Sequence, residues 1–148
     1  LLHRPPMENP KVKRPENWPD LLAQHIAEWS RRPFLWGSAD CGYFAADWMA
    51  KLGYEDPLAG LAWTNARSVI GLFRATGGYE HIVQAKMVAM GCADVAVKLA
   101  KRGDLALMNL GNRHPVLGIV NGAGVLLKTK TGVAEFSLRG HAIRTWAV

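Results

Sequence analysis

The stretch that decides the fold is RRPFLWGSADCGYFAADWM, residues 31–49. Its opening Arg-Arg-Pro ends a helix, because proline and the residue before it disfavour helical continuation. Apolar residues between Phe44 and Met49 recur at three- and four-residue spacing, which predicts an amphipathic helix. Asp40 is suited to cap its start, and Gly53 ends it after Leu52.

The rest of the chain divides into a helical first part and a strand-rich second part. Apolar spacing and capping residues predict helices over residues 17–32 and 64–75. Residues 79–90 are a shorter helix or a strand, and a helix is favoured. Short apolar runs bounded by turn residues predict strands over residues 105–110, 116–122, 124–129, 135–138 and 143–148, with a tight turn at Asn121-Gly122. Helices followed by an antiparallel meander predict an α+β fold.

Composition predicts one globular domain. The chain has 148 residues, 49% of them hydrophobic, which is enough apolar material for one core. Residues 1–16 are basic and proline-rich and are interpreted as an extended arm, with a single domain over residues 17–148. No apolar run has membrane length and no secretory signal peptide is recognised, so no membrane insertion is expected.

The net charge, the cysteines and the histidines limit which partners, disulfides and metal sites can be expected. A net charge of +6 favours anionic partners, but the basic residues are scattered and nucleic-acid binding is not expected. The two cysteines, Cys41 and Cys92, are too few for a disulfide framework, although one bridge between them stays open. The five histidines form no HxxxH or HExxH pattern, so neither a metal site nor another cofactor is expected.

Cys41 is the candidate nucleophile. The first turn of a helix directs unpaired N–H groups and the positive end of the dipole at this position, which stabilises a thiolate. The same N–H groups can bind an oxyanion, and Gly42 leaves room for a substrate backbone. The alternative is that Cys41 is a packing residue, as free cysteines commonly are.

Three segments together resemble the NlpC-type peptidoglycan peptidases, which have a papain-like fold. The first is the aromatic-x-Trp-Gly and Asp-Cys-Gly-x-Phe pattern of residues 34–44, the second is RGDLAL at 102–107, and the third is HPVLGIVNGAGVLLK at 114–128. The closing segment, TGVAEFSLRGHAIRTWAV, is similar to a smaller uncharacterised family common in phage tail gene clusters. This second resemblance is the closer one over the full length.

The resemblance implies a papain-like domain with N-terminal helices packed on a C-terminal antiparallel sheet. It implies a cysteine endopeptidase, with Cys41 as nucleophile and His114 as base, that hydrolyses peptidoglycan stem peptides through a thioester. It further implies a hydrolase carried in the phage virion at the tail tip, made in the host cytoplasm and bound to other tail-tip proteins. An amidase or acyltransferase would use the same chemistry on another substrate.

Several positions depart from the NlpC-type pattern. When Gly118-Ile119 is aligned with the family's Gly-Ile, the base histidine falls on Val116, and His114 lies two residues earlier. The family's third polar residue falls near Lys128, whose ammonium cannot accept a hydrogen bond from an imidazole. These departures favour an alternative, a catalytically inactive structural or assembly component of a phage tail tip.

Other site residues carry two interpretations each. Asp40 is interpreted as a helix cap, with a catalytic acid that orients the base as the alternative. Lys128 lies at the position where the NlpC-type pattern has its orienting residue. Trp36 and Gly42 are expected to line the substrate groove, with a core position the alternative for Trp36. His25 is expected to be a partly buried core or surface residue.

Overall fold

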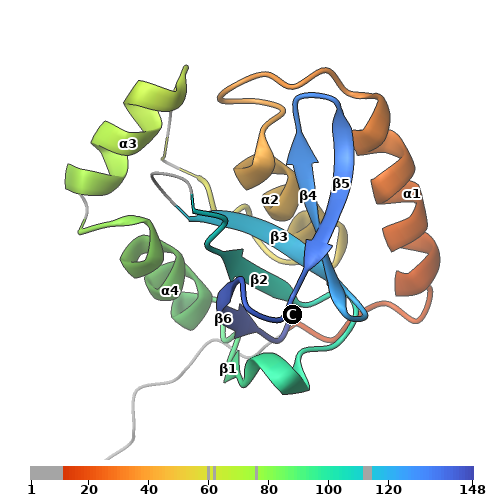
Figure 1. Ribbon diagram of the computed structural model, residues 1–148. Coiled ribbons are helices and arrows are strands. Elements are labelled where there is room, and N and C mark those ends of the chain that lie inside the picture. Colours follow the sequence, from red (N-terminus) through yellow and green to blue (C-terminus); the bar gives the residue numbers. More distant parts are fainter. Residues whose placement is uncertain (1–11, 60, 62, 76, 112–114) are drawn as a thin grey trace, which may run out of the picture.

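The computed structural model describes residues 12–148 except 60, 62, 76 and 112–114 (Figure 1). The described residues form four α-helices, one short 3-10 helix and a six-stranded sheet. The helices are α1 (Trp18–Arg31), α2 (Cys41–Lys51), α3 (Ala66–Ala75), α4 (Tyr79–Ala89) and the 3-10 helix η1 (Val97–Leu99). The strands are β1 (Asp94–Val95), β2 (Leu105–Met108), β3 (Val116–Asn121), β4 (Gly124–Thr129), β5 (Gly132–Ser137) and β6 (Ala142–Trp146).

The sheet is antiparallel at every pairing and has the order β1-β6-β2-β3-β4-β5. Strands β2 to β5 follow one another as a meander, and β6 then returns to the free edge of β2. This arrangement confirms the predicted α+β class. The four helices were each predicted, and all of them precede the meander.

Several details of the strand prediction were wrong, and β1 was not predicted at all. The two residues between the paired Asn121 and Gly124 are Gly122 and Ala123, so the turn lies one residue later than Asn121-Gly122. Gly122 has φ +67°, the conformation that a two-residue hairpin turn requires at its first central position. Strand β5 begins at Gly132 rather than Glu135, because its residues pair with β4 along the whole hairpin.

The main core lies between the helices and one face of the sheet. Helix α2 packs on β3 and β4, while α1 packs beside α2 and against β5 (Figure 1). The predicted inward residues of α2 are all buried, among them Phe44, Trp48 and Met49. Because side chains alternate along a strand, Leu105 and Leu107 of β2 join this core, whereas Ala106 and Met108 belong to a smaller cluster on the opposite face.

Three buried tryptophans connect these layers through their indole N–H groups. Trp29 of α1 donates to Asp47 of α2, with Nε1 and Oδ2 2.8 Å apart. Trp48 donates to the Gly103 carbonyl before β2, also at 2.8 Å, and Trp146 of β6 donates to Gln84 of α4 at 2.8 Å. Each ring therefore contributes apolar burial while its polar N–H keeps a partner.

The residues before α1 lie against the domain. Val12 packs on the main core, and the guanidinium of Arg14 donates to Asp104, to the carbonyl of Arg102 and to that of Val148. The end of the segment interpreted as an arm is thus bound to the sheet. In the described part of the chain, no helix combines the length and the apolarity needed to cross a membrane.

Candidate functional site

Cys41 is the first residue of α2, and Asp40 is the N-cap. The backbone of Asp40 is extended, with φ −108° and ψ −174°, and its Oδ1 accepts a hydrogen bond from the Tyr43 N–H at 3.0 Å. This is the ordinary geometry of an aspartate cap. It fixes the start of α2 and therefore the position of the Cys41 side chain.

The Asp40 carboxylate also holds two segments outside α2. Its Oδ2 accepts from the Gly37 N–H at 2.9 Å and from the indole N–H of Trp63 at 2.5 Å. Gly37 has φ +86°, and a Cβ built on it would lie 2.0 Å from the Trp63 carbonyl oxygen. Only glycine fits this turn. Asp40 thus joins the turn before Cys41 to the loop that carries Trp63.

The Cys41 thiol borders a small pocket with mainly aromatic and apolar walls. Gly42 forms part of the wall, and a Cβ there would lie 3.4 Å from the Trp63 ring. Trp36 and Gly42, both expected in the groove, do line this pocket. The complete set of described lining residues is Trp36, Asp40, Cys41, Gly42, Trp63, Val69, Tyr79 and Pro115.

Burial raises the pKa of the Cys41 thiol to about 12, and the adjacent Asp40 carboxylate contributes in the same direction. The backbone N–H groups of Gly42 and Cys41 act in the opposite sense, as expected at a helix N-terminus. Burial dominates because a thiolate loses its hydration in the pocket. The described residues alone therefore keep the thiol protonated near neutral pH.

The other predicted site residues lie in different places. His114 lies outside the described residues, but Pro115, the next residue in the chain, lines the Cys41 pocket. Lys128 is buried on β4, and its Nζ donates to the carbonyl of Trp29 at 2.8 Å and to that of Arg32. Lys128 thus binds the carbonyl groups at the C-terminal end of α1. Neither Cys41 nor Cys92 is in a disulfide, and Cys92 is buried in the main core.

Two aromatic residues are among the pocket residues that the sequence analysis missed. Trp63 comes from the loop before α3, and Tyr79 is the first residue of α4. Burial raises the pKa of Tyr79 well above its ordinary value, and the negative charges of Cys41 and Asp40 raise it further. Trp63 and Tyr79 are more than twenty residues from Cys41 in the chain. No local sequence pattern links them to it, because they reach the pocket only through the packing of α3 and α4.

Replacing Asp40 by asparagine is expected to make Cys41 react faster with iodoacetamide. Loss of the neighbouring negative charge lowers the thiol pKa, and a fall of one unit gives roughly tenfold more thiolate at pH 8. Site-resolved mass spectrometry over a range of pH measures the midpoint of labelling. The same substitution at exposed Asp20 is the control, and an unchanged midpoint in Asp40→Asn would contradict the assigned influence of the carboxylate.

The fold and the site together define a class of protein: an α+β domain with a cysteine at the N-terminus of a helix that packs on an antiparallel sheet. The chain belongs to the family described as a domain of unknown function, DUF6950, whose model matches residues 13–148. No curated protein matches the chain. The family match includes Arg14 and extends through β6, so it covers the whole described domain apart from Val12.

Proposed function

We propose that this protein is a papain-like cysteine peptidase that hydrolyses peptidoglycan stem peptides, with Cys41 as nucleophile and His114 as base. The observation that carries the proposal is the position of Cys41 at the start of α2, in a pocket whose wall includes Pro115. His114 is the residue before Pro115 in the chain. The proposal requires the His114 imidazole to come within hydrogen-bond reach of the thiol.

The proposed reaction is acyl transfer to sulfur followed by hydrolysis. His114 takes the proton of Cys41 Sγ, and the thiolate attacks the amide carbonyl carbon of the substrate. The backbone N–H groups at the start of α2 stabilise the oxyanion. His114 then gives its proton to the leaving amine, and a water molecule hydrolyses the thioester to release the acid and the free thiol.

The resemblance to NlpC-type peptidases and to phage tail-associated relatives supports the proposed setting. In this proposal the protein is carried in the virion with other tail-tip proteins and cuts cell-wall peptides during DNA entry. Trp36, Trp63 and Tyr79 line the pocket beside Cys41, and aromatic side chains are common in the walls of ligand sites. A peptide would have to bind over the mouth of this small pocket, with only the reacting group beside the thiol.

The direct test is the release of soluble peptide fragments from purified peptidoglycan. Cys41→Ala is expected to abolish release, because it removes the nucleophile. His114→Ala is expected to reduce the rate about 100-fold or more, the usual contribution of a general base. Cys92→Ala is the matched control and should retain activity, since Cys92 is a buried thiol in the core. Release by Cys41→Ala at the wild-type rate would rule out the proposal.

A second function is favoured by the electrostatics of the same pocket. Burial and Asp40 oppose ionisation of Cys41, and Lys128 is engaged by the end of α1. Both observations suit an inactive structural component of a tail tip that keeps the fold without turnover.

The reactivity of Cys41 separates the two functions. If the protein is a peptidase, iodoacetamide should alkylate Cys41 below pH 7 faster than it alkylates a free thiol. This fast labelling should be lost in His114→Ala. A structural component requires slow labelling at neutral pH and no effect of that substitution. Circular dichroism of each variant confirms that the comparison is made on folded protein.

A further inference from the structure

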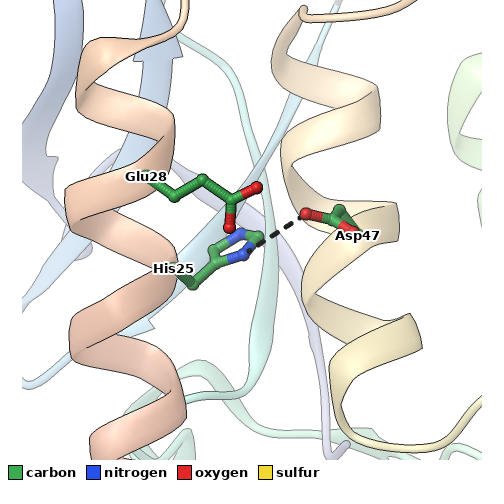
Figure 2. A group of neighbouring side chains, drawn as sticks. All are labelled: His25, Glu28 and Asp47. Carbon is green, nitrogen blue, oxygen red and sulfur yellow. Dashed lines mark ion pairs between the residues drawn. The ribbon is translucent and has the colours of Figure 1, made fainter.

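A second group of polar side chains lies between α1 and α2 (Figure 2). His25 and Glu28 are three residues apart and so lie on one face of α1, and Asp47 faces them from α2. One possible ligand atom from each residue lies within 4.8 Å of the other two. Asp47 is six residues after Cys41, about 9 Å along the helix, so this cluster is separate from the cysteine pocket.

The hydrogen bonds of His25 determine which nitrogen faces the cluster. Its Nε2 is 2.9 Å from the Phe44 carbonyl oxygen, and a carbonyl only accepts, so Nε2 carries the hydrogen. Nδ1 therefore carries no hydrogen, and its lone pair faces Asp47 and accepts from the Lys51 ammonium at 2.7 Å. A carbonyl that fixes the tautomer in this way is the usual outer partner of a metal-binding histidine. The imidazole is completely buried, which also fixes its orientation.

Both carboxylates are oriented by donors outside the cluster. The Trp29 indole N–H donates to Asp47 Oδ2 at 2.8 Å, and Arg32 donates to Glu28 Oε1 at 2.5 Å. These contacts resemble the outer hydrogen bonds that hold metal ligands in place. They leave Glu28 Oε2 directed at the point that His25 Nδ1 also faces.

A positive charge already occupies the meeting point of the three groups. Lys51 Nζ lies 2.7 Å from His25 Nδ1, 2.7 Å from Glu28 Oε2 and 3.2 Å from Asp47 Oδ2. The ammonium thus shows that the arrangement of acceptors suits a cation. The Lys51 side chain is 25% exposed, so its flexible stem can carry the ammonium to solvent.

We propose that His25, Glu28 and Asp47 form a binding site for a divalent transition-metal ion, with Zn²⁺ the best fit, which exchanges with the Lys51 ammonium. One imidazole and two carboxylates favour Zn²⁺ over Ca²⁺ or Mg²⁺, which prefer oxygen ligands alone. Zn²⁺ needs bonds of about 2.0–2.2 Å, so the carboxylates must close on the ion. Their side chains are 41% and 33% exposed, which leaves room for small rotations toward the ion. Water would complete the tetrahedron.

This site would strengthen the contact between α1 and α2. The proposal departs from the sequence analysis, which expected no metal site because the histidines form no HxxxH or HExxH pattern. Only His25 and Glu28 are close in the chain, and the third ligand comes from the next helix. A metal ion that binds only the folded state raises the free energy of unfolding. Once the free metal concentration exceeds Kd, the increase grows with the logarithm of the ratio of that concentration to Kd. The rise in Tm with added Zn²⁺ is therefore a readout that needs no enzymatic activity.

The test uses the full chain, freed of metal with a chelator and then titrated with ZnCl₂ by isothermal calorimetry. One ion per chain is expected. Glu28→Gln and Asp47→Asn should each weaken binding at least tenfold, and Lys51→Met should strengthen it at least tenfold because the competing charge is gone. Lys86→Met on α4 is the matched control and should leave Kd unchanged. Co²⁺ in place of Zn²⁺ reports ligand geometry through its visible absorption.

Two results would overturn the proposal. One is the absence of stoichiometric binding in both the wild type and Lys51→Met. The other is binding that survives Glu28→Gln and Asp47→Asn but is lost when the exposed His81 or the Cys41 thiol is replaced, which would assign the ion to another part of the chain. In either case the four side chains form only an ion-pair network between the helices.

Discussion

Gly118→Ala is expected to destabilise the protein by about 3 kcal/mol. A Cβ built on Gly118 would lie 2.5 Å from Leu127 Cδ2, 2.5 Å from Val125 Cγ1 and 2.6 Å from the carbonyl oxygen of Leu126. The two side chains could turn away in part, but the carbonyl belongs to the β4 backbone and cannot. Strand β4 must therefore shift relative to β3, and the packing of Val125 and Leu127 in the smaller cluster must loosen.

The measurement is the free energy of unfolding from urea denaturation followed by tryptophan fluorescence. Gly71→Ala in α3 is the matched control, because a Cβ at Gly71 meets no heavy atom within 4 Å. In a helix interior that change should stabilise by about 1 kcal/mol. If Gly118→Ala remained within 0.5 kcal/mol of the wild type, the close approach of the two strands would not exist in solution.

Gly118 also shows what the sequence could and could not predict. Its place in the apolar run 116–122 identified a buried strand, and the spacing of Phe44, Trp48 and Met49 identified α2 with its correct inward face. Both signals are local. Glycine is needed at 118 because β4 lies so close to it that a Cβ would collide with β4. This close approach depends on how the two strands pair, and neither segment alone carries a signature of it.

The same limit applies to the candidate site. Asp40, Cys41, Trp36 and Gly42 lie within seven residues, so one motif placed them together. Trp63 and Tyr79 reach the pocket only because the later helices fold back over α2. Lys128 aligned with an orienting position, yet its flexible stem ends at the carbonyls of α1, since a buried ammonium requires acceptors. Strand β5 was predicted too short because its side chains are half exposed and lack a continuous apolar run.

Asp104→Ala is expected to be the most destabilising of the polar substitutions, at about 3–5 kcal/mol. Asp104 is 4% exposed. Its Oδ1 accepts from Arg14 Nη2 at 2.7 Å and from the Val148 N–H at 3.2 Å, and its Oδ2 accepts from the Lys101 N–H at 2.8 Å. Alanine would leave a largely buried guanidinium without a counter-charge and two backbone N–H groups without acceptors.

A double-mutant cycle separates the ion pair from the other two bonds of Asp104. Arg14→Met keeps much of the apolar stem of Arg14 and removes the charge, so the double variant no longer contains an unpaired guanidinium. The double variant should then be more stable than the sum of the single losses predicts, by at least 1 kcal/mol. Urea denaturation of all four proteins measures this coupling. Strictly additive losses would mean that Arg14 contributes nothing through Asp104, and that the segment before α1 is held by its other contacts, among them the packing of Val12 on the core.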